Sequence, residues 1–189
     1  MITSLDQLDL SKKYTYADYL TWRFKERVEL IKGHIFKMSP APNRSHQSIS
    51  LTIASALHVY LRGHNCKVYD APFDVVLSKN DQSTVIQPDI CVICDQEKLT
   101  KQGCTGAPDL IIEILSPGNA QREMKEKFEL YEENGVQEYW IVSPSEQSVL
   151  IYNLKEGKYI GSKPFISGEK VGSQIVDGFD MDVQEIFAG

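Results

Sequence analysis

The feature that most constrains the fold of this chain is a nearly continuous apolar segment that contains one carboxylate in its middle. The segment reads Ala107-Pro-Asp-Leu-Ile-Ile-Glu-Ile-Leu-Ser116. Apolar runs of this kind are typical of a strand buried on both faces of a sheet. Glu113 lies within the run, and an unpaired carboxylate there would cost several kcal/mol. We therefore expect a metal, a basic side chain or a proton to offset its charge.

The preceding apolar segment, Val85-Ile-Gln-Pro-Asp-Ile-Cys-Val-Ile93, carries the same anomaly at Asp89. Pro88 has no N–H to donate to a strand ladder, so it marks an edge, a bulge or the start of a strand. Bulges often redirect a side chain toward a site. We expect Asp89 and Glu113 on adjacent strands. Asp109 should share a face with Glu113, and both a structural and a functional role remain open for it.

A helix is predicted over residues 120–134, with Asn119 as its N-cap and Gly135 after its end. Its apolar stripe consists of Ala120, Met124, Phe128 and Tyr131. Lys127 adjoins this stripe, because it lies three residues after Met124 and four before Tyr131. A lysine at the buried edge of a helix that follows the Glu113 strand can pair with that carboxylate.

Two carboxylates and one lysine form a site for a hard cation with a cationic helper. Oxygen ligands of this kind suit Mg²⁺ or Mn²⁺, and we predict Asp89 and Glu113 as the metal ligands. Hydrolysis of a phosphodiester fits such a site best, since the metal activates water and neutralises charge on the phosphate. Lys127 would then orient the water or the phosphate.

The rest of the chain predicts an α/β fold with a mixed β-sheet flanked by helices and with additional β-hairpins. Helices are expected over 15–24, with Thr15 as N-cap, over 45–61, and over 183–187 after Asp182. Hairpins are expected where turn residues separate short apolar runs. The expected strands cover 28–31, 34–38, 66–70, 73–78, 85–94, 108–115, 137–143, 148–154 and 158–161. No repeat or linker interrupts the sequence, so residues 1–189 are predicted to form a single domain.

Composition excludes several classes of protein. Hydrophobic residues make up 42% and charged residues 24% of the chain, as in ordinary soluble domains. The longest apolar runs fall far short of the roughly 20 residues of a membrane helix, and the N-terminus lacks the pattern of a signal peptide. We expect a cytoplasmic protein without a membrane partner.

The net charge of −6 is unevenly distributed. Residues 1–68 carry 10 Lys and Arg against 5 Asp and Glu, whereas residues 69–189 carry 10 against 21. This asymmetry indicates either an acidic site beside a basic contact surface or chance surface composition.

Four cysteines, at positions 66, 91, 94 and 104, are expected to be reduced thiols, because no secretion signal is present. Cys91 and Cys94 have the spacing of a redox or zinc motif. They lie three apart on a predicted strand, however, so their side chains should point to opposite faces. A zinc site is not expected.

Together these residues resemble the Uma2 family, formerly DUF820, of the PD-(D/E)XK restriction-endonuclease-like superfamily. The likeness extends over about residues 14–187. The matching segments are Arg27-Val-Glu-Leu-Ile-Lys-Gly33, Met38-Ser-Pro with His46 downstream, Gln87-Pro-Asp-Ile90, Gly106-Ala-Pro-Asp-Leu-Ile-Ile-Glu-Ile-Leu-Ser-Pro117, Lys127-x3-Tyr131 and Gly135-Val-Gln-Glu-Tyr-Trp140.

The resemblance implies a restriction-endonuclease-like core with Asp89, Glu113 and Lys127 as catalytic residues. In the superfamily pattern the lysine stands two residues after the acid, but here that position is Leu115. The resemblance implies that Lys127 on the following helix takes its place. Glu29 is similar to the acidic residue that such folds contribute from their N-terminal part.

The first hypothesis is a Mg²⁺- or Mn²⁺-dependent endonuclease that acts on DNA, with homodimerisation expected because two strands need two sites. The second is a catalytically silent nuclease-fold module that binds nucleic acid or a protein, and the third is a hydrolase of other phosphate esters. His46 is expected to pack or to cap its helix, and Tyr139 and Trp140 to lie in the core. Basic side chains that could contact phosphates are Arg23, Lys25, Arg27, Lys32, Lys37 and Arg44.

Overall fold

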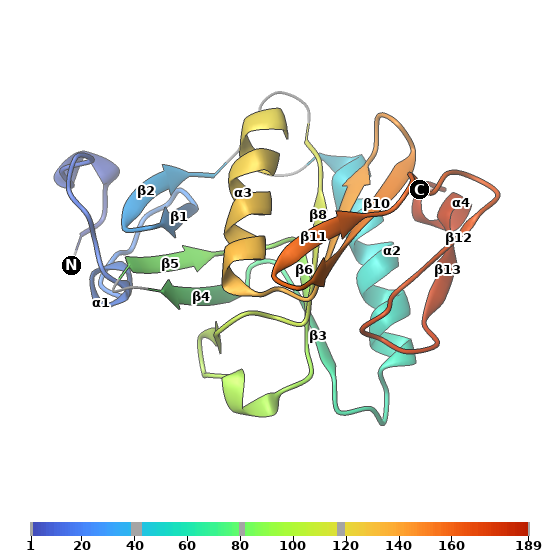
Figure 1. Ribbon diagram of the computed structural model, residues 1–189. Helices are drawn as coiled ribbons and strands as arrows, with labels where there is room; N and C mark the ends of the chain where they lie inside the picture. The colour runs from blue at the N-terminus through green and yellow to red at the C-terminus, as the bar shows by residue number, and fades with distance from the viewer. Residues whose placement is uncertain (1, 39–42, 80–81, 117–119, 189) are drawn as a thin grey trace.

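The computed structural model describes residues 2–38, 43–79, 82–116 and 120–188. Two β-sheets lie side by side, with helices packed against them and a short two-stranded ribbon near the C-terminus (Figure 1). The predicted α/β class with mixed sheets, flanking helices and additional hairpins is confirmed. No helix in the described part of the chain has the length and apolar character needed to cross a bilayer.

The larger sheet has six strands, and its central pair, β8 and β9, is parallel while the other neighbours are antiparallel. Its strands, in spatial order, are β11 (Lys158–Gly161), β10 (Ser148–Lys155), β9 (Glu138–Ser143), β8 (Leu110–Ile114), β6 (Ile90–Ile93) and β3 (Lys67–Asp70).

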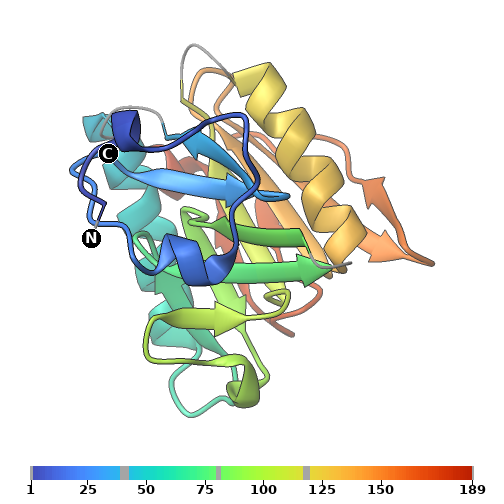
Figure 2. The same cartoon turned by 90° about the vertical axis from the view of Figure 1, so that its left-hand side faces the viewer.

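The second sheet has five strands and is formed mainly by the N-terminal half of the chain. In spatial order they are β2 (His34–Lys37), β1 (Val28–Ile31), β5 (Gln82–Ile86), β4 (Asp74–Lys79) and β7 (Gly103–Thr105). Figure 2 views the molecule from this side, where the N-terminal segment with α1 (Tyr16–Tyr19) lies against the sheet. Trp22, Leu30 and Val85 belong to the buried cluster between them.

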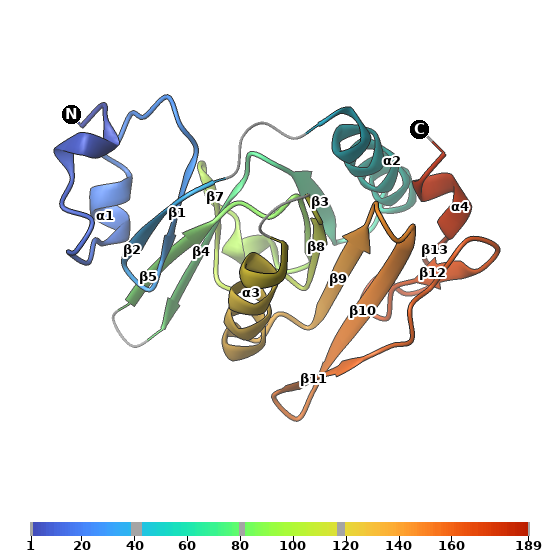
Figure 3. The same ribbon diagram turned by 90° about the horizontal axis from the view of Figure 1, so that it is seen from above.

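The two long helices, α2 (Arg44–Tyr60) and α3 (Ala120–Asn134), cover opposite faces of the six-stranded sheet (Figure 3). The C-terminal ribbon of β12 (Lys170–Gly172) and β13 (Asp180–Asp182) lies on the α2 side, together with α4 (Val183–Ile186).

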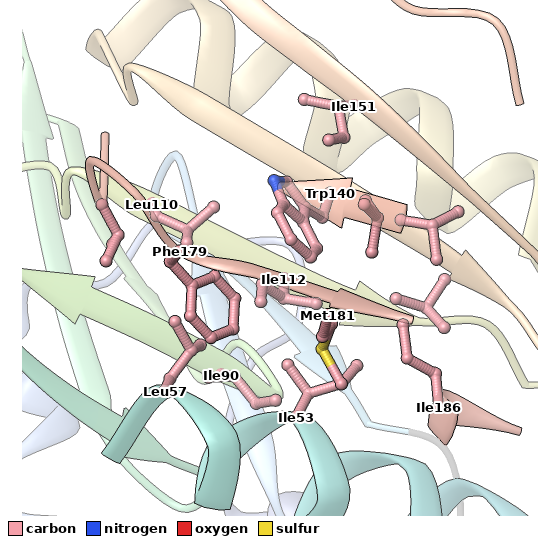
Figure 4. Close-up of a cluster of buried hydrophobic side chains, with 14 of the residues drawn as sticks. Ile53, Leu57, Ile90, Leu110, Ile112, Trp140, Ile151, Phe179, Met181 and Ile186 are labelled. Atoms are coloured by element: carbon pink, nitrogen blue, oxygen red, sulfur yellow. The ribbon is translucent and has the colours of Figure 1, made fainter. Parts of the chain in front are cut away.

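Alternation along β8 explains this layering. Leu110, Ile112 and Ile114 pack into the cluster on the α2 side, where Figure 4 shows several of the side chains. Ile111 packs on the α3 side, and Glu113 shares that face because successive strand residues point in opposite directions. The buried strand therefore directs its one carboxylate toward α3.

The predicted strand over 85–94 is wrong as a single element. The chain forms β5 up to Ile86, leaves the five-stranded sheet through Gln87, Pro88 and Asp89, and starts β6 at Ile90 in the other sheet. Pro88 thus precedes a strand start, which was one of the roles expected for it. The break places Asp89 between the two sheets.

The predicted hairpins are confirmed, and their turn residues explain them. Lys32 and Gly33 both have positive φ, as do Glu156 and Gly157, which is the geometry of tight two-residue turns. The first predicted helix is shorter than expected: Thr15 caps it as predicted, but it ends at Tyr19 instead of residue 24. The predicted cap Asn119 lies outside the described residues.

The expectation of four reduced thiols is wrong for two of them. Cys66 and Cys94 form a disulfide, whereas Cys91 and Cys104 are free and buried. The register of β3 and β6 pairs Lys67 with Ile93, so the next residues outward face each other across the strands. Cys91 points into the α3-side cluster and Cys94 packs against the α2-side cluster, as the predicted opposite orientation requires.

We expect two free thiols per chain in unfolded protein that has not been reduced, and four after reduction, because one disulfide joins Cys66 and Cys94. Titration with a thiol reagent in denaturant measures both values. A Cys66→Ser variant should show three thiols before and after reduction. Four thiols in unreduced wild-type protein would contradict the pairing.

Candidate active site

A cavity of about 150 Å³ opens between the two sheets, next to α3 and the first turn of α2. Acidic residues from four segments line it: Glu29 from β1, Asp89 from the break after β5, Glu113 from β8 and Glu126 from α3. Its other lining residues include Arg27, Ile31, Phe36, Lys37, Met38, His46, Ile114, Leu115, Met124, Lys127 and Tyr139.

Glu113 is held by two donors on one of its oxygens. Lys127 Nζ lies 2.9 Å from Oε1, and the Tyr131 hydroxyl donates to the same atom at 2.5 Å. Burial raises the pKa of Glu113 to about 7, although Lys127 acts in the opposite direction. Lys127 is therefore the basic side chain that offsets the charge of the buried Glu113 carboxylate.

Lys127 bridges two carboxylates, since its Nζ lies 2.9 Å from Glu113 Oε1 and 3.6 Å from Glu29 Oε1. Burial by itself lowers the pKa of Lys127, but the charges of Glu113 and Glu29 outweigh it and raise that pKa above its usual range. The amine therefore stays protonated at neutral pH and cannot serve as a base there.

Asp89 is fixed through its Oδ2 atom. The backbone N–H of Ile114 donates to this oxygen at 2.8 Å, and His46 Nε2 lies 3.2 Å from it. Because β6 begins at Ile90, opposite Ile112, no β6 strand residue lies opposite Ile114 to accept this N–H. The Asp89 carboxylate takes that place and is thereby tied to the end of β8.

Glu29 is anchored in the same manner from the other sheet. Its Oε1 accepts the backbone N–H of Gln87 at 3.0 Å, where the chain leaves β5. Arg27, two residues earlier, donates to the Gln87 side chain at 2.7 and 3.0 Å. Glu29 thereby lines the same cavity as Asp89 and Glu113.

Each of these carboxylates therefore commits one oxygen to protein donors, and within the described residues no hydrogen bond or ion pair involves the second oxygen. Carboxylate oxygens are the ligands that Mg²⁺ and Mn²⁺ prefer. Among the described residues, no three acidic, histidine or cysteine groups are close enough to enclose a metal ion. The donor set fits a cation that is held by one or two carboxylates and completes its shell with water.

His46 is a site residue that the sequence reasoning did not identify. The expected cap of α2 is provided by Asn43, whose Oδ1 accepts the His46 N–H, while the imidazole lies buried against Asp89. Burial lowers the pKa of His46, but Asp89 and Glu113 outweigh it and raise that pKa. The sequence did contain an indication of this position, because a histidine three residues before Ile49 lies on the apolar face of the predicted helix.

Tyr131 lies in the apolar stripe of its helix and in the Lys127-x3-Tyr131 motif but was not predicted as a site residue, although its hydroxyl donates to Glu113. Asp109 lies outside the cavity and has structural contacts: its carboxylate accepts from the Cys94 N–H at 2.8 Å and from Gln137 at 3.3 Å. Of the two roles left open for Asp109, these contacts favour the structural one. Tyr139 and Trp140 are fully buried, as predicted.

The basic side chains expected at phosphates differ in their surroundings. Arg27 and Lys37 line the cavity. Arg23 donates to backbone carbonyls, and Lys32 pairs with Glu133 at 2.8 Å. Lys25 and Arg44 are exposed.

Comparisons with known proteins identify relatives of this sequence and a solved structure with a similar fold. The sequence model of the Uma2 family, described as "Putative restriction endonuclease", matches residues 16–184. The uncharacterized protein slr1290 of Synechocystis sp. is 26% identical over 147 residues, which cover 76% of each chain. A crystal structure described as a putative nuclease belonging to DUF820, from Anabaena variabilis, has a TM-score of 0.72 and 20% identity, covering 93% of this chain and 98% of that one.

We expect Lys127→Met to lower the free energy of unfolding by about 3–5 kcal/mol near pH 8, because it leaves Glu113 without its buried partner. Between 4.5 and about 7, folded Glu113 holds a proton that the unfolded chain has released, so this group makes stability fall as pH rises. Without the lysine the pKa of Glu113 rises further, so the stability falls over a wider pH range. The decrease in the free energy of unfolding should therefore be larger at about pH 8 than at about pH 5. Urea unfolding at both values measures it.

Lys125→Met is the matched control for this substitution. Lys125 lies on the same helix, its side chain is 79% exposed, and it pairs with Glu129 at 4.0 Å. Its loss should change the free energy of unfolding by less than about 1 kcal/mol. Equal effects of the two substitutions would contradict the assigned pairing.

Proposed function

The chain belongs to the Uma2 family, and we propose that it is a metal-dependent endonuclease that hydrolyses phosphodiester bonds of DNA. The family and the nuclease-like fold support a nuclease function. One contact carries the finer proposal: the Lys127 ammonium lies 2.9 Å from the buried Glu113 carboxylate in a cavity that also contains Asp89. Carboxylates with a fixed ammonium group match the chemistry of phosphoryl hydrolysis.

Asp89 and Glu113 are the proposed ligands of Mg²⁺ or Mn²⁺. Both line the cavity, and each has one oxygen held by the protein, which leaves the other for a cation. A divalent ion bound there would lower the pKa of a water molecule and neutralise charge on the phosphate. Glu29 supports the site by holding Lys127 from the second sheet.

Lys127 is the proposed electrostatic partner of the reacting phosphate. Its raised pKa keeps the amine protonated, so it can donate to a phosphate oxygen or orient the water, but it cannot accept a proton at neutral pH. In this proposal Lys127 on α3 takes the place of the lysine on the strand. The apolar Leu115 at the usual lysine position would then only line the cavity.

The N-terminal part of the chain is the proposed DNA-contacting region. Arg27 and Lys37 line the cavity, so a phosphate bound beside the carboxylates would also lie near these cations. Because the whole chain carries a net charge of −6, such local cations are needed to attract a polyanion. We also propose that residues 1–189 form one nuclease domain, which cuts both strands as a homodimer.

A silent nucleic-acid- or protein-binding module is the second candidate. The observation that favours it is Leu115, which leaves the strand without the usual lysine. Fold alone does not determine activity.

We expect wild-type protein to cut plasmid or single-stranded DNA with Mg²⁺ or Mn²⁺, and the Glu113→Ala and Lys127→Ala variants to lose at least about 100-fold in rate, because they remove a proposed ligand and a charge-stabilising group. Gel-based cleavage assays measure this, and Lys125→Ala should cut like wild type.

The same assay separates the alternatives. DNA binding without cleavage that survives Glu113→Ala would support the silent module. Turnover of small phosphate esters without cleavage of the polymer would instead identify a different phosphoesterase. Either result would contradict the endonuclease proposal.

Metal binding should strengthen as the pH rises toward 7, because the ion requires the ionised form of Glu113, whose pKa is raised to about 7. Below that pH the Mn²⁺ affinity should fall by up to about tenfold per pH unit, with about one proton released per ion bound. Calorimetry in buffers of different ionisation enthalpy measures both quantities. An affinity that is constant between about pH 5.5 and 7 would contradict Glu113 as a ligand.

A further inference from the structure

We propose that His46 is a positioning residue that orients the Asp89 carboxylate for binding of the divalent cation. The inference rests on the proposed function, because it concerns the same metal site. It starts from the close approach of His46 Nε2 to Asp89 Oδ2, at 3.2 Å, in the cavity wall.

Two donors hold the same oxygen of Asp89. Ile114 donates its backbone N–H to Oδ2 at 2.8 Å, from the end of β8, and His46 approaches from the first turn of α2. A carboxylate held by one donor can still rotate about its last side-chain bond and exchange its two oxygens. A second donor on the same atom opposes that rotation and keeps Oδ1 as the oxygen that a cation can bind.

Asp89 needs such support more than Glu113 does. It lies in the break between β5 and β6, and its side chain is 20% exposed, whereas Glu113 is built into a strand and its side chain is 11% exposed. Glu113 also receives two side-chain donors, Lys127 and Tyr131. His46 is the side chain that gives Asp89 a comparable second contact.

The burial of His46 argues against a role in packing alone. The residue is 6% exposed, and its Nδ1 atom is buried without a hydrogen-bond partner among the described residues. A buried polar atom without a partner is unfavourable. A leucine would fill this part of the α2 stripe without that cost but could not donate to Asp89.

His46 is itself held in place. Its backbone N–H donates to Asn43 Oδ1 at 2.9 Å, which caps the helix, and Ile49 and Ile53 on the same face are buried in the core below it. The imidazole is therefore attached to a rigid element. Groups that orient metal ligands typically change metal affinity by about 10- to 100-fold when they are removed.

The test is the Mn²⁺ dissociation constant, measured by calorimetry without DNA at about pH 8. His46→Leu and His46→Ala remove the donor, and both should weaken Mn²⁺ binding by about 10- to 100-fold. His46→Gln keeps an N–H at similar reach and should restore the affinity to within about threefold of wild type. Ile49→Ala is the matched control, since it removes buried volume one turn along the same helix face and should leave the affinity unchanged.

Circular dichroism and thermal melts establish that each variant is folded. His46→Ala provides a second donor-free variant with less steric demand, should the leucine variant not fold. Unchanged Mn²⁺ affinity in a folded donor-free variant would overturn the inference. So would a His46→Gln variant as weak as His46→Ala, or an Ile49→Ala variant weakened to the same extent.

Failure of the inference and failure of the proposed function give different results. If Asp89→Ala and Glu113→Ala abolish Mn²⁺ binding while His46→Ala does not change it, the result supports the metal site and contradicts the positioning role of His46. If wild-type protein does not bind Mn²⁺, the proposed metal-dependent function falls, and the role of His46 falls with it.

Discussion

The structure of the site depends on one buried carboxylate. Glu113 cannot move to the surface, because its neighbours in β8 fill hydrophobic clusters on both faces of the six-stranded sheet. The charge must therefore be offset where it lies, and Lys127 and Tyr131 on α3 do so. This requirement fixes which face of α3 meets the sheet. The contacts that hold this helix face against the sheet therefore also form part of the site.

The break between β5 and β6 is the second determinant of the site. At this point the chain passes from one sheet to the other, and backbone groups that would otherwise pair within a ladder become donors for carboxylates. The Gln87 N–H serves Glu29, and the Ile114 N–H serves Asp89. Every buried backbone donor needs an acceptor. At this break the two N–H groups are paired with carboxylates, and negative charge is therefore concentrated between the sheets.

Local sequence patterns predicted those features that depend on local spacing. The hairpin at Lys32-Gly33 follows from turn chemistry, and the pairing of Lys127 with Glu113 follows from helix periodicity and an uncompensated buried charge. Long-range features were not accessible in this way. The apolar run 85–94 has the same periodicity whether its halves pair with one sheet or with two. The contact of His46 with Asp89, like the disulfide, depends on which distant segments the fold brings together.

The balance of charge in the cavity connects these features to the proposed chemistry. Glu29, Asp89 and Glu113 surround the Lys127 ammonium. Glu126, Arg27 and Lys37 also line the cavity. Like charges at close range raise one another's pKa, and Asp89 acts on Glu113 in this direction. A divalent cation would relieve that repulsion, whereas phosphate alone would increase it. In the proposed mechanism Asp89 and Glu113 would hold this cation, and its charge would reduce the repulsion that a phosphate, attracted by Arg27 and Lys37 in the cavity wall, meets there.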